Sequence, residues 1–167
     1  LPDFRTFMKE KINPQPLELK LQPGRPSPLC SQSLGASVIR ILATIPDSDS
    51  SILSPIIRDD IAALYEAVEI AIHQDSAIIR NGHSMGGDEA LSGRAGLLRA
   101  LLNIERHKVD NTTSIALQPV LKLKTKLRDA ITDAGRRQGE EYATMYSQTE
   151  ALPLMWPWLD NYCGLGA

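Results

Sequence analysis

Cysteine is scarce in this sequence, and so are aromatic residues and net charge. The two cysteines of the 167-residue chain, Cys30 and Cys163, lie far apart and form no C-x-x-C pair. They therefore supply neither a disulfide framework nor a zinc knuckle. Reducing compartments favour such sparse, unpaired cysteine, so we expect a cytoplasmic protein.

The charge balance and the hydrophobic runs exclude two further classes. A formal net charge of −2 provides no concentrated cationic surface of the kind that nucleic acids require. Every apolar run falls well short of the roughly 20 residues that cross a bilayer, and no charged-then-apolar signal segment opens the chain. We therefore expect no nucleic-acid partner and no transmembrane segment.

Proline is concentrated near the start of the chain. Residues 13–29 contain five of the 11 prolines, and no helix or central strand can run through them. The apolar stretch from Leu34 to Ile45 predicts one short helix. We expect residues 1–53 to form an extended, proline-rich entry with that helix, and residues 54–167 to form a helical domain.

The apolar pattern beyond residue 53 predicts long helices. Ser54 and Pro55 suit an N-cap and a first helical position. One stripe of the helix that follows collects Ile57, Ile61, Leu64, Val68, Ala71, Ile72 and Ile79. Residues 88–106 are apolar on two faces, which predicts an inner helix buried between layers. Residues 114–138 predict a third helix and residues 152–167 a loop, so the predicted fold class is all-α.

A serine-hydrolase motif competes with this helical interpretation. Gly82-His83-Ser84-Met85-Gly86 matches the G-x-S-x-G nucleophile elbow, which needs a buried strand before the serine and a histidine after it. The later histidine, His107, would lie about 30 Å away along the helix that the elbow begins. The pattern therefore favours a glycine-rich turn between two helices, and a hydrolase using Ser84 is kept as an alternative.

Two segments carry a resemblance to a known family. The stretch EALSGRAGLLRALL, residues 89–102, resembles the signature of eukaryotic lanthionine synthetase C-like (LanC-like) proteins: an acidic residue, G-R-x-G and a leucine-rich helix. The stretch LPLMWPWLDNYCGLGA, residues 152–167, is similar to the family's P-L-M-aromatic segment, which continues through G-A into His-Gly. The two segments follow the family's order and approximate spacing.

The resemblance implies a fold and a chemistry. The fold is a double-layered (α/α) toroid, of which residues 54–167 would form a part. The chemistry is the addition of a thiol to a dehydroamino acid, helped by a zinc ion that two cysteines and one histidine hold and that deprotonates the thiol. For eukaryotic members the resemblance implies a glutathione-like thiol and, as acceptor, dehydroamino acids in peptides or proteins.

Carried over residue by residue, the resemblance marks four positions. Glu89 matches an active-site acid and is the predicted catalytic residue, able to orient a proton-transferring group. Arg94 is predicted to bind the carboxylate of a thiol peptide, and Gly93 and Gly96, which shape the helix entry, complete the predicted substrate-binding set. The alternative is that Glu89 and Arg94 only cap and brace the helix.

The family's metal site is not carried over. The resemblance places its histidine directly after Ala167 and its cysteine and Cys-His ligands further on. Because the chain also begins with Leu1 and not with Met, we expect both ends to be cut. We expect no cofactor in this chain, with zinc implied for the complete parent. A partial toroid would leave an apolar helix face uncovered, which predicts self-association. A non-catalytic helical interaction scaffold is the other alternative.

Overall fold

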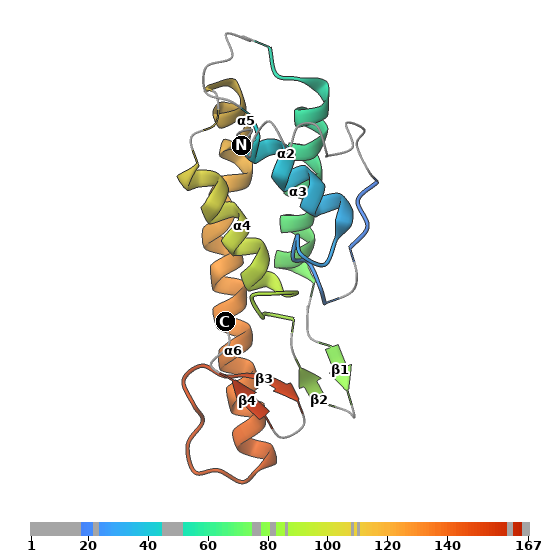
Figure 1. Cartoon of the computed structure of the whole chain (residues 1–167). Helices are drawn as coiled ribbons and strands as arrows, with labels where there is room; N and C mark the ends of the chain where they lie inside the picture. Colours follow the sequence, from blue (N-terminus) through green and yellow to red (C-terminus); the bar gives the residue numbers. More distant parts are fainter. Residues whose placement is uncertain are drawn as a thin grey trace, which may run out of the picture.

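The computed structural model of the chain describes residues 18–21, 24–44, 52–74, 78–80, 83–85, 87–107, 109, 111–159 and 162–164. Within these residues it contains five helices and two short hairpins (Figure 1). The helices are α2 (Gln32–Leu42), α3 (Pro55–His73), α4 (Arg94–Arg106), α5 (Asn111–Lys122) and α6 (Lys124–Met145). The strands are β1 (Ile78–Arg80), β2 (His83–Met85), β3 (Trp156–Leu159) and β4 (Tyr162–Gly164).

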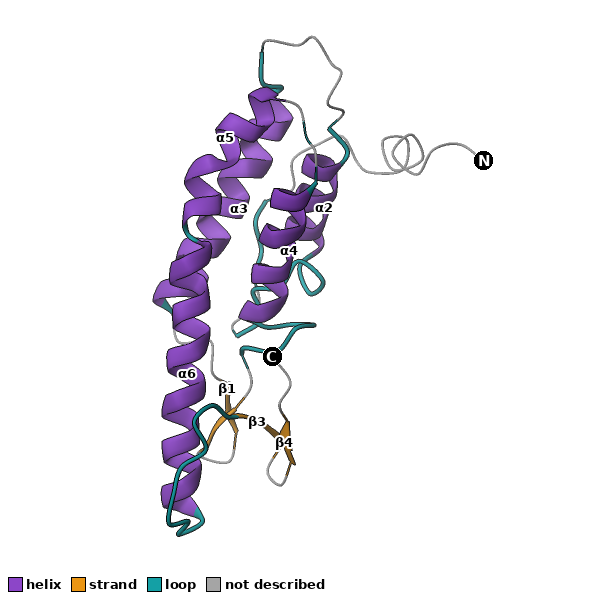
Figure 2. Cartoon of the chain, turned by 90° about the vertical axis from the view of Figure 1, so that its left-hand side faces the viewer, coloured by secondary structure: helices purple, strands orange, loops and turns teal. Residues whose placement is uncertain are grey.

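The helices form two layers. Figure 2 shows α3, α5 and α6 on one side and α2 and α4 on the other. Helix α2 contacts α3, and α4 contacts α6, so each helix of one layer packs on a helix of the other. The all-α prediction is confirmed for this helical architecture. None of the helices in the described ranges is both long and apolar enough to cross a membrane.

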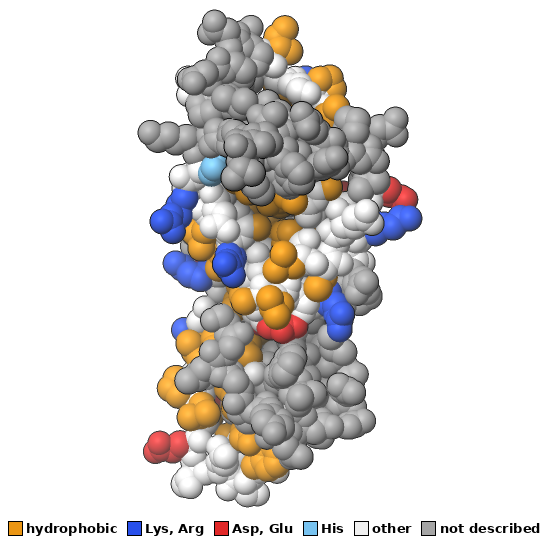
Figure 3. Space-filling view, viewed as in Figure 1, with side chains coloured by type: hydrophobic (Ala, Val, Ile, Leu, Met, Phe, Trp, Pro, Cys, Tyr) orange, Lys and Arg blue, Asp and Glu red, His pale blue; other side chains and the backbone are white. Residues whose placement is uncertain are grey.

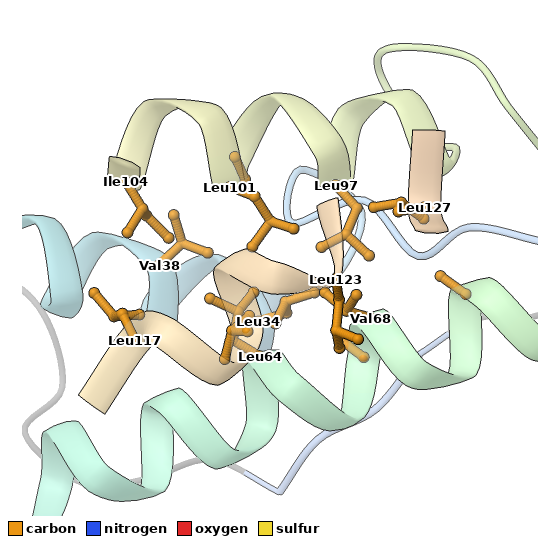
Figure 4. Close-up of a cluster of buried hydrophobic side chains, with 14 of the residues drawn as sticks. Leu34, Val38, Leu64, Val68, Leu97, Leu101, Ile104, Leu117, Leu123 and Leu127 are labelled. Atoms are coloured by element: carbon orange, nitrogen blue, oxygen red, sulfur yellow. The ribbon is translucent and has the colours of Figure 1, made fainter. Parts of the chain in front are cut away.

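The hydrophobic core lies between these layers. Figure 4 shows Leu97 and Leu101 of α4 pointing towards side chains of α2 and α3. Leu34 of α2 and Leu64 of α3 are fully buried, as are Leu97 and Leu101. Burying such a side chain contributes about 1.5–3 kcal/mol, so the contact between layers is the main stabilising feature.

A buried ion pair fixes α2 against α3. Arg40 Nε donates to Asp60 Oδ2 at 2.7 Å, and the hydroxyl of Ser37 donates to Asp60 Oδ1 at 2.7 Å. The side chains of Arg40 and Asp60 are 8% and 1% exposed. Since these bonds join Arg40 and Ser37 of α2 to Asp60 of α3, the pair specifies how α2 is placed on α3.

Helix α3 begins where the sequence predicts and ends earlier than expected. Ser54 is the N-cap residue and Pro55 the first helical residue. The buried stripe contains Ile61, Leu64, Val68 and Ala71. Helix α3 ends at His73, however, and Ile79 lies in strand β1, so its assignment to the helical stripe is wrong.

The predicted helix 114–138 is two helices. Residue Leu123 separates α5 from α6, and its N–H bonds to the Val120 carbonyl at 3.0 Å, three residues back. Pro119 lies inside α5, where it removes one backbone donor and strains the turn around it. The apolar stripe nevertheless continues through the break, with Leu127 of α6 fully buried.

Two hairpins interrupt the otherwise helical chain. β1 pairs antiparallel with β2, with Ile79 opposite Ser84, and β3 pairs antiparallel with β4. The sequence predicts a turn and a loop in these two places, so the strands correct those predictions. Each strand has only three or four residues, too few for a two-residue periodicity to stand out.

Residues 18–21 and 24–29 of the proline-rich entry contain no helix, as predicted, but residues 24, 28 and 29 lie in turns, so the extended form holds only in part. Helix α2 confirms the short helix, with bounds shifted to Gln32–Leu42. The side chain of its N-cap residue, Ser31, accepts a hydrogen bond from the Leu34 N–H. Residues 1–17, 22–23 and 45–51 of the predicted 1–53 segment lie outside the described residues.

Candidate functional site

The predicted site residues lie at the entrance to α4, in a tight turn formed by residues 87–93. Gly87 has a φ of 84°, in the left-handed region that glycine tolerates. Its carbonyl accepts a hydrogen bond from the Arg94 N–H at 2.8 Å, and the Glu89 carbonyl accepts one from the Gly93 N–H at 2.9 Å. These bonds close the turn, so α4 begins at Arg94 and not at residue 88 as predicted.

Arg94 is buried and paired with a neighbouring acid. Its Nη2 donates to Asp88 Oδ2 at 3.0 Å, and its Nε donates to Asp88 Oδ1. The side chains of Arg94 and Asp88 are 4% and 1% exposed. The Arg94 Nη1 lies 3.5 Å from the Ala71 carbonyl, near the end of α3. This geometry supports the bracing alternative, because a substrate carboxylate would have to displace Asp88 from the guanidinium.

Glu89 is half-buried, and a short contact within the turn occupies one of its carboxylate oxygens. The Ser92 hydroxyl donates to Glu89 Oε1. The position is one residue away from the buried Asp88 and ahead of the α4 N-terminus, where the helix dipole favours a negative charge. The carboxylate is therefore held within the turn through Ser92, and its catalytic role stays a prediction.

Gly93 and Gly96 allow chain segments to approach closely. A Cβ on Gly93 would lie 2.5 Å from both the Glu89 nitrogen and the Gly87 oxygen, inside the turn. A Cβ on Gly96 would lie 2.5 Å from the hydroxyl oxygen of Ser27 in the proline-rich entry. Both glycines are buried, so what they contact in this chain is backbone and Ser27. Substrate contact at either glycine stays a prediction.

The second segment of the resemblance packs on α6. Met155 is buried, and its N–H donates to the Gly135 carbonyl at 3.0 Å. Trp156 donates from Nε1 to the Ile131 carbonyl at 3.3 Å. Its ring covers Gly135, where a Cβ would lie 2.6 Å from the indole. Strand β3 also contacts β2, so this segment reaches the strand that leads into the turn.

Helix α4 is buried on one face only, which corrects the prediction of burial on two. Leu97 and Leu101 are fully buried, whereas Leu102 is 43% exposed and Leu91, in the turn, is 67% exposed. Figure 3 shows hydrophobic side chains at the middle of the face that bears α2 and α4, with Lys and Arg on either side. On the second apolar face, Ala95 and Leu98 are partly buried against the core, whereas Leu91 and Leu102 stay exposed.

Ser84 does not lie in the setting that a nucleophile elbow needs. It occupies the middle of β2, in a two-stranded antiparallel hairpin, and α4 begins ten residues later. An elbow is a sharp turn between a strand of a parallel sheet and a helix. The described strands form no parallel sheet. The geometry therefore gives no support to the hydrolase alternative.

The described residues do not fit a zinc site. No group of three or more His, Cys, Asp or Glu side chains within them is arranged to hold a metal ion. Cys30 is a free thiol whose sulfur lies 3.9 Å from the Leu91 carbonyl, and the side chain of Cys163 lies outside the described set. His73 is exposed and pairs with Glu69 at 3.1 Å. We therefore derive no step through zinc from these residues.

Two residues of this site escape sequence reasoning. Asp88 holds Arg94, and its only sequence signal is a second acid beside Glu89 in front of the G-R-x-G stretch. Ser27 is fully buried, its N–H donates to the Ser92 carbonyl at 3.0 Å, and its hydroxyl lies against Gly96. Nothing local marks Ser27, because 65 residues separate it from Ser92 in the chain.

Comparison with known proteins adds no identification: no family model, no curated protein and no solved structure matches this chain. What the residues define is a two-layered helical protein with a tightly braced turn at the start of α4.

Proposed function

We propose that the chain is part of a LanC-like (α/α) domain whose complete form adds a glutathione-like thiol to dehydroamino acids in peptides or proteins. One observation carries the proposal: β3, which belongs to the second segment of the resemblance, contacts β2, which leads into the first. Segments about 50 residues apart in sequence are thus brought to one end of the helical layers. The two-layered packing supports the same proposal.

Thiol addition requires a group that holds a proton and delivers it to the acceptor. It forms one carbon–sulfur bond, and a proton is delivered to the α-carbon of the acceptor, so no oxidant or reductant takes part. A zinc ion held by residues outside the described part of this chain would supply the thiolate at neutral pH. Among the described residues, Glu89 is the group proposed to hold or orient a proton, because it is half-buried beside the α4 N-terminus.

The remaining residues of the turn have a positioning role in this proposal. The pair of Arg94 with Asp88 anchors the turn to α4 and, through the Ala71 carbonyl, to α3. Gly93 and Gly96 let the turn and the proline-rich entry lie close to the helix. In this proposal, Arg94 binds a substrate carboxylate only if Asp88 moves away from its guanidinium. The cytoplasm is proposed as the compartment on cysteine usage alone.

The test is a thiol-addition assay on the complete polypeptide encoded by the gene. A peptide containing dehydroalanine is incubated with glutathione and zinc, and the adduct is detected by mass spectrometry. We expect an adduct that a chelator abolishes. Glu89→Gln should lower kcat at least about tenfold and flatten the pH profile, since a general acid or base contributes about 10²–10⁴-fold. Glu141→Gln, an exposed glutamate of α6, is the matched control.

Two outcomes would contradict the proposal, the first as a whole and the second only in the role of Glu89. One is a complete polypeptide that forms no adduct with zinc supplied. The other is activity that is retained in Glu89→Gln, which would remove the catalytic role of this residue while leaving the reaction in place. A non-catalytic helical scaffold is the second candidate, favoured by the exposed Leu91 and Leu102, and it predicts partner binding without adduct formation.

A further inference from the structure

A hollow lies between α3 and α5, in the layer away from α4. Its volume is about 380 Å³, and its lining is almost entirely carbon. Ile61 and Val120 are the most deeply buried of its residues, at 8% and 1% exposure. Ala62 of α3 and Pro119 of α5 line it as well. No residue of α2, α4 or the turn takes part, so this hollow is separate from the candidate site.

Exposed apolar residues occur close in sequence to the residues that line the hollow. Ile52, next to the lining residue Leu53, is 76% exposed. Ile115 lies one helical turn before Pro119 and is 73% exposed. Tyr65, which lines the hollow, is 39% exposed. Large apolar side chains gathered at one place on a surface mark an interaction site, whereas single ones do not.

Charge is distributed unevenly along this groove. Arg58 lines one end, is exposed, and has no partner among the described residues. Seven residues on, Tyr65 donates its hydroxyl to Glu69, whose carboxylate raises the pKa of the Tyr65 phenol. Arg58 and Tyr65 lie seven residues apart on one stripe of α3, so the groove carries a cation at the Arg58 position, whereas Glu69 lies outside its lining.

We propose that this groove docks an amphipathic helix of a partner protein, with an acidic residue of that helix placed against Arg58. From Arg58 to Tyr65 is about 10 Å along α3, since each residue rises 1.5 Å. That length matches the apolar anchors at positions i, i+4 and i+7 of a bound helix. The open shape of the groove suits a helix better than a small ligand, which a pocket normally encloses on most sides. Arg58 has no ion-pair partner among the described residues, so its charge favours a partner helix with an acidic residue.

The probe is a synthetic helical peptide with leucines at i, i+4 and i+7 and a glutamate one turn beyond them. The comparison peptide carries lysine in place of the glutamate. We expect the acidic peptide to bind more tightly and to shift the amide signals of α3 and α5 in NMR spectra. Arg58→Glu should weaken its binding roughly fivefold and favour the lysine peptide instead, as expected for a charge pair at the rim.

The controls separate this groove from the rest of the molecule. Arg106→Glu changes an exposed arginine of α4 in the other layer and should leave both affinities unchanged. Because Arg58 is exposed, circular dichroism of Arg58→Glu should match the parent chain. Equal affinity for the two peptides, no binding of either, or equal weakening by Arg106→Glu would each overturn the proposal.

Other occupants would give different results. A medium-chain fatty acid that shifts the same amide signals, when neither peptide does, would assign the groove to a lipid. A dimer that Ile115→Ser dissociates would assign it to a second copy of this chain. Both results contradict the proposed partner helix. None of these outcomes depends on thiol addition, because the groove shares no residue with the turn at α4.

Discussion

The guanidinium of Arg94 donates hydrogen bonds from two of its nitrogens to the carboxylate of Asp88, and both side chains are buried. Asp88→Asn would leave the buried arginine charge without its counter-ion, which typically costs about 3–5 kcal/mol of unfolding free energy. Urea denaturation followed by circular dichroism measures this. Asp133→Asn removes the acid of an exposed pair with Arg136 and should change stability by less than about 1 kcal/mol. Equal effects of the two substitutions would contradict a structural role for the Arg94 pair.

Gly96 should tolerate no side chain. Gly96→Ala places a methyl group 2.5 Å from the Ser27 hydroxyl oxygen, and overpacking of this kind typically costs about 1–3 kcal/mol. Ser27→Gly in the same chain should recover only part of the loss, because the Ala90 carbonyl also meets the new methyl group. Thermal melting of the single and double variants gives the answer. Full recovery would show that Ser27 alone sets the requirement for glycine.

Gln138 is a buried amide whose nitrogen and oxygen have no hydrogen-bond partner in the part of the chain that the structure describes. Leaving such a group unsatisfied costs about 1–3 kcal/mol, whereas an apolar group of similar shape costs nothing of this kind. We therefore expect Gln138→Met to raise the unfolding free energy of this chain or leave it unchanged. Gln118→Met, at an exposed position of α5, is the control and should be neutral. A loss above about 1 kcal/mol in Gln138→Met would mean that the amide is satisfied in solution.

The phenol of Tyr65 should lose its proton at a higher pH than the phenol of an ordinary tyrosine, because its pKa is raised. Its hydrogen bond to Glu69 and the charge of that carboxylate favour the protonated phenol, so its pKa is raised. The folded chain then holds this proton to higher pH than the unfolded chain does. The stabilisation from the pair is therefore present at neutral pH and is lost as the pH rises through the raised pKa. Glu69→Gln should lower the pKa in NMR titrations of the ring carbons, and Glu66→Gln should lower it less.

Exposed leucines around α4 should make this chain self-associate. Leu91 and Leu102 present apolar surface, at 67% and 43% exposure. Sedimentation velocity over a range of concentrations should show reversible association, which Leu91→Ser with Leu102→Ser reduces. Ile115→Ser, on the other layer, should have no such effect. A monomer at every concentration would contradict this expectation.

Sequence reasoning succeeded where the signal is local or periodic. The start of α3 follows from Ser54 and Pro55, and the buried stripe of Ile61, Leu64 and Val68 follows from helical spacing. It failed at Leu123, because an apolar stripe runs across the break between α5 and α6 without a change of period. The hairpin strands are too short to show a period at all.

The candidate site was partly accessible to sequence reasoning. The G-R-x-G stretch pointed to residues 89–96, and the structure places them at one tight turn. The partner of Arg94 could not be read from the sequence, since Glu89 and Asp88 are adjacent acids and only the path of the turn decides between them. Ser27 required knowledge of how the entry segment crosses α4, which is a long-range property of the fold.

The division of the core between early and late helices has a consequence for synthesis on the ribosome. Leu127 and Ile131 of α6 belong to the same apolar cluster as Leu97 and Leu101 of α4. While α6 is still inside the exit tunnel, the core-facing side of α4, with Leu97 and Leu101, is exposed on the nascent chain. A chaperone that shields nascent apolar segments should therefore stay bound until α6 has emerged, and ribosome profiling of such a chaperone would reveal the moment of its release.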